Sequence, residues 1–389
     1  MRPLYALVAI FATAMSVAIV YIPQAIFTTF ADDFGISAVR ARDTFTVSAI
    51  SYALAFFVFG PLSDVFSARM LGSVGAFATA IFGTLSAISN SFVGLILSIA
   101  ATGIAAASVP SAMFAMAGKT EPEKSGRYFG IILAATVAGI TIGRSIGALI
   151  TGEIGWRWAY GTFAIMILIA GFCSLGLPAV NHKNCNVIRA YSTAMGMVVR
   201  PAVLSFLTIG GALFVGYLGI TTILTLRLSG PPMFLDSTAI GLVSLSGLIA
   251  LVGAPFAGTL VPKIGPKKVS VIGLIVCVIG AILIVFASNV WVATAGLLIL
   301  YLGVFAAQPA LMVRLSGFIE PELKGSASAV YFLVCLLAGS FGGSLLGWLC
   351  HRQGWFFAAG IAAIAIFIAL LIAFVKHDKS GVISAKVTI

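Results

Sequence analysis

Arg144 is the one charged side chain deep within an apolar stretch, residues 128–151, that is long enough to cross a membrane. Charge inside a bilayer is costly and normally faces a water-filled cavity or a partner. A guanidinium can hold a carboxylate or phosphate through two parallel hydrogen bonds, so Arg144 is a candidate for binding an anionic solute. Two alternatives stay open: Arg144 binds backbone carbonyls at a helix contact, or it snorkels outward.

Further polar side chains within apolar stretches could contact the same solute. Two of them neighbour a proline, which frees a backbone carbonyl and permits a kink. The alternative for each is that its hydroxyl or amide serves helix packing. These candidates are Tyr21, Gln24, Tyr217, Thr221 and Gln308.

Carboxylates, by contrast, are confined to loops and helix ends: all 11 Asp and Glu fall there. The outer ends of two apolar stretches are flanked by Asp32, Asp33 and Asp43. We interpret these residues as solvated loop positions rather than as proton carriers. One Arg without a carboxylate favours an anionic, zwitterionic or neutral solute over an organic cation.

No pattern in the sequence is typical of an enzyme. The three His lie outside the apolar stretches, and the 5 Cys lack metal-ligand spacing. A phosphate-binding loop, an HExxH motif and a triad-like cluster are all missing. We therefore expect no catalytic residue, no metal site and no cofactor, and any transport would be secondary, driven by a gradient.

The composition dictates what must position these residues. With 61% hydrophobic and 8% charged residues and a mean hydropathy of +1.16, the chain is excluded from the soluble enzymes and nucleic-acid-binding domains. Twelve stretches are long enough to span a membrane as helices. They are residues 4–30, 44–62, 70–88, 92–116, 128–151, 158–179, 202–226, 238–260, 269–287, 291–313, 326–349 and 355–375.

The basic residues predict the orientation and the domains. Most Lys and Arg fall in every second connecting segment, which places both termini in the cytoplasm of a bacterial-type inner membrane. The longest interior gap separates two groups of six helices. The predicted parts are a first half at 1–180, a central cytoplasmic loop at 181–201, a second half at 202–376 and a tail at 377–389.

The two halves repeat each other. Gly60-Pro-Leu-Ser-Asp64-Val-Phe-Ser-Ala-Arg69 recurs 198 positions later as Gly258-Thr-Leu-Val-Pro-Lys-Ile-Gly-Pro-Lys267. The series Gly139, Gly143 and Gly147 recurs as Gly339, Gly343 and Gly347, and further matches recur at nearly the same offset. Two homologous halves around a central path are typical of transporters, with the substrate near mid-membrane.

The first repeated element resembles the G-x-L-x-D-x-x-G-x-[RK] signature of the major facilitator superfamily, although Ser67 replaces its second Gly. Gly130-x8-Gly139-x3-Gly143-Arg144-x2-Gly147-Ala148 resembles the G-x8-G-x3-G-P-x2-G-G motif of its drug–proton antiporter-like branches. Arg144 stands where that motif has Pro, which is similar to the YnfM-type inner-membrane transporters.

The resemblance implies an all-α fold of twelve transmembrane helices in two pseudo-symmetric halves. It implies a conformational gate at Gly60, Asp64, Arg69, Gly139, Gly143 and Gly147. The glycine stripe is expected to pack against the helix near 238–260 and to let one half rock against the other. Helices 1, 4, 7 and 10 of the family line the cavity.

The expected function is secondary active transport of a small organic solute by alternating access, with no nucleic-acid partner. Proton-coupled export of a metabolite, drug or anionic compound, siderophores included, is the first interpretation, and a proton-coupled uptake symporter of an organic anion is the alternative. A monomer is the default for this architecture.

Overall fold

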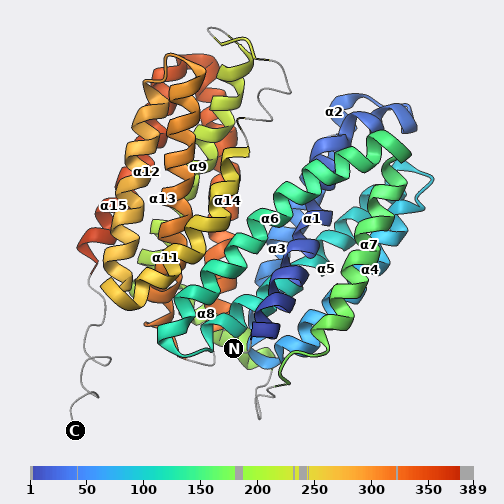
Figure 1. Ribbon diagram of the computed structural model, residues 1–389, viewed down its shortest axis with the longest axis horizontal. Helices are drawn as coiled ribbons and strands as arrows, with labels where there is room; N and C mark the ends of the chain where they lie inside the picture. The colour runs from blue at the N-terminus through green and yellow to red at the C-terminus, as the bar shows by residue number, and fades with distance from the viewer. Residues whose placement is uncertain are drawn as a thin grey trace. The chain divides into compact units, whose positions relative to one another are not determined.

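The structure, a computed structural model, describes residues 3–41, 43–179, 187–230, 233–235, 243, 245–320 and 323–376. These residues are almost entirely helical (Figure 1). Twelve of the helices are long and apolar enough to cross a membrane, which confirms the predicted all-α membrane fold. The helices before residue 187 are α1 (Pro3–Phe34), α2 (Ala38–Ala41), α3 (Asp43–Val65), α4 (Ala68–Ala87), α5 (Phe92–Gly118), α6 (Pro122–Ile154) and α7 (Trp156–Ser174).

The later elements start within the predicted central loop. They are α8 (Val187–Val198), α9 (Pro201–Ser229), η1 (Leu245–Ile249), α11 (Ala250–Ile264), α12 (Pro266–Val285), α13 (Val290–Ser316), α14 (Lys324–Gln353) and α15 (Trp355–Val375). The described part of the span predicted at 238–260 thus consists of the helical residue 243, the short 3₁₀ turn η1 and the first part of α11.

The chain divides into two compact units that do not coincide with two continuous segments. Unit 1 takes the start of α14 and unit 2 takes the start of α6, so each of these helices belongs to both units. Unit 1 comprises Met1–Thr120, Ile131–Ala194 and Glu322–Leu333. Unit 2 comprises Glu121–Gly130, Met195–Pro321 and Val334–Ile389.

Side-chain caps fix where the helices of unit 1 begin. The Ser67 hydroxyl accepts a hydrogen bond from the Met70 amide at the start of α4, and Ser91 does the same for Gly94 at the start of α5. Within α1, Pro23 removes a helical donor, and the backbone leaves helical geometry at Ile26. This kink lies close to the candidate residues of α1.

Unit 2 packs through small residues. An added Cβ at Gly273 of α12 would lie 2.7 Å from the Ala307 nitrogen of α13, and one at Gly303 would lie 2.5 Å from the Cys277 nitrogen. The two helices consequently approach closely and run side by side (Figure 1). The Asn289 side chain caps α13 by accepting from the Val292 amide at 2.9 Å.

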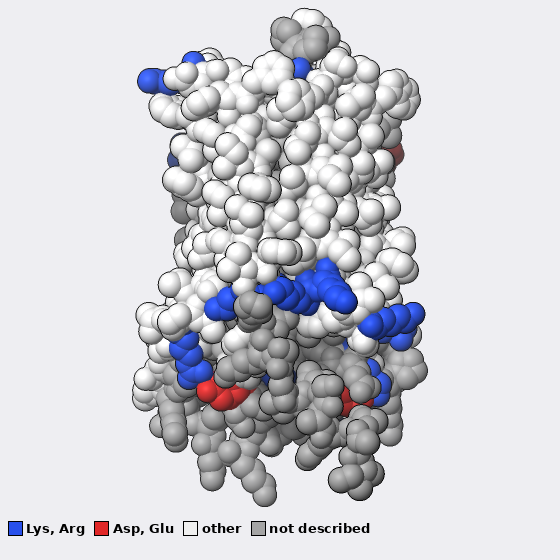
Figure 2. Space-filling view, turned by 90° about the vertical axis from the view of Figure 1, so that its left-hand side faces the viewer, with Lys and Arg blue, Asp and Glu red and all other residues white. Residues whose placement is uncertain are grey.

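The outer surface of unit 2 is apolar over most of its height. Figure 2 shows a row of Lys and Arg side chains along the lower edge of a broad uncharged surface. Large hydrophobic side chains are exposed on this unit, Phe356 at 62% and Ile272 at 52% among them. Such a surface is stable only against hydrocarbon, in keeping with a membrane-embedded chain.

Candidate functional site

The glycine stripe of α6 packs against α1 of the same unit. A Cβ at Gly143 would overlap the Ala18 carbonyl, and one at Gly139 would overlap the carbonyl of Ala14. Gly147 is less tight, because its Cβ would lie 3.2 Å from Cγ1 of Ile22. The expected partner of the stripe, the helix near 238–260, is therefore wrong: periodicity reveals the packing face of a helix but not the helix that covers it.

The helix near 238–260 instead meets the start of α6, within unit 2. A Cβ at Gly130 would overlap the Ala254 carbonyl of α11, and one at Gly258 would overlap the carbonyl of Gly126. Gly130 belongs to the same motif as the stripe, yet it serves a different contact. The motif thus supplies close packing to both units.

Arg144 lies on the exposed side of α6, beside the buried Gly143. No carboxylate of the described residues pairs with it, and it lies close enough to the Tyr21 hydroxyl for the two groups to interact electrostatically. The Tyr21 ring packs on Phe45 at 5.7 Å between centroids. Gln24, one turn further along α1, has a buried Oε1 without a hydrogen-bond partner. Arg144, Tyr21 and Gln24 are thus brought to one region of unit 1.

The other three candidates lie in unit 2. Tyr217 of α9 joins a cluster of aromatic rings, with the Tyr301 centroid at 5.7 Å and the Phe305 centroid at 6.4 Å. The Thr221 hydroxyl lies within hydrogen-bonding distance of the Tyr217 and Leu218 carbonyls of its own helix. Gln308, on α13, is 1% exposed, and neither atom of its amide group has a hydrogen-bond partner.

Asp64, at the end of α3, forms hydrogen bonds with the start of α14. Its carboxylate accepts from the amides of Gly325 at 2.7 Å and Ser326 at 2.8 Å, and from the Ser326 hydroxyl at 2.6 Å. The Lys119 ammonium lies 3.9 Å from Oδ1. A carboxylate at a helix N-terminus satisfies amides that have no partner within the helix. Asp64 is 1% exposed, so these contacts are shielded from water.

Close packing and a lysine extend this junction. A Cβ at Gly60 would lie 2.5 Å from the Ala329 side chain, and the Lys324 ammonium donates to the Gly118 carbonyl at 2.8 Å. Arg69, the remaining residue of the signature, is exposed and takes no part in these contacts. The structure thus brings Gly60 and Asp64 together against α14, but not Arg69.

Asp33 is held in an ion pair at the other end of unit 1. Its Oδ2 accepts from the Trp156 indole at 3.0 Å and from the Arg157 guanidinium at 2.9 Å. The guanidinium also lies over the Trp156 ring, 4.3 Å from its centroid. These bonds give Asp33 a structural role. Among the described residues, no group of three or more His, Cys, Asp or Glu could hold a metal ion.

Comparison with known proteins identifies the family. The family model of the Major Facilitator Superfamily matches residues 4–343 and 234–386. The chain belongs to the Major Facilitator Superfamily.

Members of this superfamily resemble the chain over nearly its full length. An uncharacterized MFS-type transporter, YybF of Bacillus subtilis, is 24% identical, with 91% of this chain and 88% of the relative covered. The inner membrane transport protein YnfM of Escherichia coli is 25% identical, with 93% and 88% covered. The structure of the Major Facilitator Superfamily transporter FucP superposes with a TM-score of 0.76 at 13% identity, covering 96% and 98% of the two chains. The protein is thus a multi-pass secondary transporter of this superfamily.

Several residues of this Major Facilitator Superfamily chain escaped the sequence analysis. Tyr301 and Phe305 read as ordinary apolar positions, and only their spacing of one turn, with Gln308 three residues on, marks a shared face of α13. Ser326 gave no signal as the partner of Asp64, although it neighbours Gly325 in the repeated loop element. Arg314, one residue beyond the span predicted at 291–313, is buried near the end of α13 and donates to the Ser270 hydroxyl at 3.0 Å.

Proposed function

We propose that this secondary transporter is a proton-coupled exporter of a small organic solute that carries an anionic group. Metabolites, drugs and carboxylate-bearing chelators such as siderophores fall in this class. Arg144 carries the proposal, because it is a charged group within a membrane-spanning helix that lies exposed beside a closely packed face.

The surroundings of Arg144 support a binding role. An exposed guanidinium within a span is stable only where water or a polar partner reaches it. No described carboxylate neutralises it, which leaves its five N–H donors for a ligand. Tyr21 adds a hydroxyl within electrostatic reach, and Gln24 adds an amide oxygen that has no partner. A solute anion would accept hydrogen bonds from Arg144 and Tyr21, and a hydroxyl or amide donor on the same solute would satisfy the Gln24 oxygen.

The direction of transport rests on the glycine pattern of α6, which resembles that of export branches. Uptake of an organic anion together with protons is the alternative, and it uses the same Arg144. We further propose that both termini lie in the cytoplasm of a bacterial cell, whose inner membrane holds the protein, because the basic residues are distributed as the positive-inside rule requires. A monomer is the default for this architecture.

The binding role predicts how Arg144 variants respond to ligands. In a thermal-shift panel on purified protein, organic anions should raise the Tm of the wild type by mass action, while lipophilic cations should not. Arg144→Leu should abolish the rise in Tm that anions cause. Arg144→Lys should lower the affinity for the anion about tenfold or more, because an ammonium cannot form two parallel hydrogen bonds as a guanidinium does.

Ser145→Leu is the matched control, because Ser145 is the next residue of α6 and is also exposed. It should keep the anion effect. Stabilisation by lipophilic cations that persists in Arg144→Leu would return the protein to a multidrug role and make Arg144 structural.

Direction is tested in proteoliposomes with an imposed pH gradient and a stabilising anion from the panel. Proton flow opposite to the anion supports export by antiport. Proton flow with the anion favours the uptake symporter and overturns the export proposal.

A further inference from the structure

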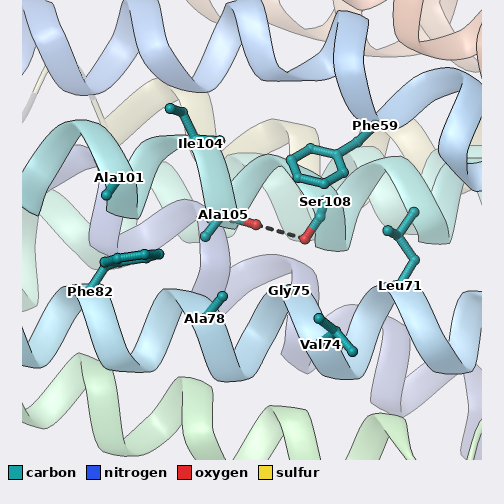
Figure 3. A pocket seen from close by; sticks show the side chains of 10 residues that line it. All are labelled: Phe59, Leu71, Val74, Gly75, Ala78, Phe82, Ala101, Ile104, Ala105 and Ser108. Carbon is teal, nitrogen blue, oxygen red and sulfur yellow. Dashed lines mark hydrogen bonds between the residues drawn. The ribbon is translucent and has the colours of Figure 1, made fainter.

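Each unit carries an apolar groove on its surface, and the two grooves are built in the same way. The groove of unit 1 lies among α3, α4 and α5 and has a volume of about 320 Å3 (Figure 3). The groove of unit 2 lies among α11, α12 and α13 and has a volume of about 180 Å3. All six helices include membrane-spanning segments.

The two grooves correspond residue by residue. A shift of 198 positions, the offset of the internal repeat, converts lining residues of the first groove into lining residues of the second. The groove is therefore a feature of the repeated unit that both copies keep. Matching pairs are Leu71 with Val269, Gly75 with Gly273, and Ile104 with Leu302.

The chemistry of the lining excludes a polar ligand. Ser108 is the one residue with a polar side chain in the first groove, and its hydroxyl donates to the Ala105 carbonyl at 2.7 Å (Figure 3). The equivalent of Ser108 in the second groove is Ala306. Exposed hydrophobic side chains form the rims, Val74 at 58% and Phe256 at 61% among them. Such a groove can hold only hydrocarbon.

A basic residue lies at the same end of both grooves. Arg69 is the second residue of α4, and Lys267 is the second residue of α12. Each comes two positions before a lining residue, and Leu71 marks one end of the first groove in Figure 3. No described residue forms an ion pair with either side chain. A free cation at a helix N-terminus attracts a phosphate.

We propose that each groove binds one acyl chain of an anionic phospholipid, whose phosphate is held by Arg69 in unit 1 and by Lys267 in unit 2. Lipid hydrocarbon surrounds these helices, and an unfilled depression would lose dispersion contacts on one side. A chain lying in the groove restores those contacts. The basic residue selects the headgroup, since a juxtamembrane cation attracts anionic lipid.

Native mass spectrometry of the full chain, released from nanodiscs of phosphatidylglycerol and phosphatidylcholine, tests the proposal. The wild type should retain two phosphatidylglycerol molecules. Ala78→Phe and Val276→Phe fill equivalent positions of the two grooves, so each should leave one retained lipid and the double variant none. Arg69→Gln combined with Lys267→Gln should lower the preference for phosphatidylglycerol over phosphatidylcholine at least tenfold.

Two matched controls should keep both lipids. Ile165→Phe enlarges a 57% exposed residue of α7 outside the grooves, and Arg352→Gln removes a positive charge at the far end of α14. Two lipids retained by the Ala78→Phe/Val276→Phe protein would overturn the proposal. So would equal retention of the two headgroups by the wild type.

Photo-crosslinking of the unmodified chain guards against variants that fail to fold. Phosphatidylglycerol with a diazirine in mid-chain should label peptides from residues 59–108 and 253–306. Labelling spread evenly over the exposed faces of α7 and α15 would show that lipid has no preferred groove, and this result would also overturn the proposal.

Discussion

At the scale of single residues, the carboxylates Asp64 and Asp33 differ in whether water can replace a lost hydrogen-bond partner. Asp64 is 1% exposed and accepts three hydrogen bonds from Gly325 and Ser326. Asp33 has a side chain that is 39% exposed and pairs with Arg157. Breaking a buried set leaves donors without partners, whereas water reaches the groups of an exposed pair.

We therefore predict that Asp64→Asn lowers the free energy of unfolding by about 1–3 kcal/mol, because an amide offers one acceptor oxygen and turns a donor toward the remaining amides. Asp33→Asn should cost about 0.2–1 kcal/mol. Unfolding of both variants in detergent, followed by tryptophan fluorescence, compares them. A larger loss for Asp33→Asn would contradict this account.

At the scale of elements, α6 and α1 can pack closely because the glycines of α6 have no side chains. The Ala18 carbonyl occupies the space that a Cβ on Gly143 would need, and backbone cannot rotate away as a side chain can. At Gly147 the neighbour is the side chain of Ile22. The two helices therefore approach more closely at Gly143 than at Gly147.

Substitutions along α6 should follow this gradient. Gly143→Ala should destabilise the protein by about 1–3 kcal/mol through overpacking, and Gly147→Ala should cost less. Gly152→Ala is the control, because no atom lies within 4 Å of its added Cβ. The melting temperatures of the three variants should rank in that order, with Gly143→Ala lowest. Equal values for Gly143→Ala and Gly152→Ala would refute the close contact.

The elements themselves follow from the sequence, but their partners do not. A run of apolar residues must form internally hydrogen-bonded helices in a membrane, so all twelve spans were predicted. Glycines four residues apart revealed the packing face of α6. The partner of that face depends on how the helices pack in three dimensions. Nothing in the sequence around Ala18 indicates that it contacts Gly143. The same holds for Tyr301, which joins Tyr217 from a distant helix.

At the scale of the whole molecule, the internal repeat is kept in its packing but not in the buried carboxylate of its first copy. Gly60 and Gly258 both allow close approach to a helix start, of α14 and α6 respectively. The equivalent of Asp64 is Pro262, which offers no carboxylate. The second copy therefore has no counterpart of the Asp64 carboxylate, whose buried charge-assisted hydrogen bonds join α3 to α14.

This difference predicts how separated halves behave. Residues 1–180 alone lack Gly325 and Ser326, so the Asp64 carboxylate loses its hydrogen-bond donors. The fragment should be degraded faster alone than when residues 202–389 are co-expressed as a second chain. Pulse-chase labelling measures both half-lives. Asp64→Asn should narrow the difference, and equal half-lives without that substitution would contradict the prediction.

Several hydroxyls of the first spans donate their hydrogen bonds within their own helices, as Ser16 does to Ala12 and Thr79 to Gly75. These hydrogen bonds need no later part of the chain. Asp64 is different, because its donors lie 261 and 262 residues further along the chain. At a synthesis rate of about 5–20 residues per second, that carboxylate waits roughly 13–50 s for them. The junction of α3 with α14 consequently forms late in the synthesis of the protein. In nascent chains stalled before residue 325, the Asp64 carboxylate should still lack its donors on Gly325 and Ser326.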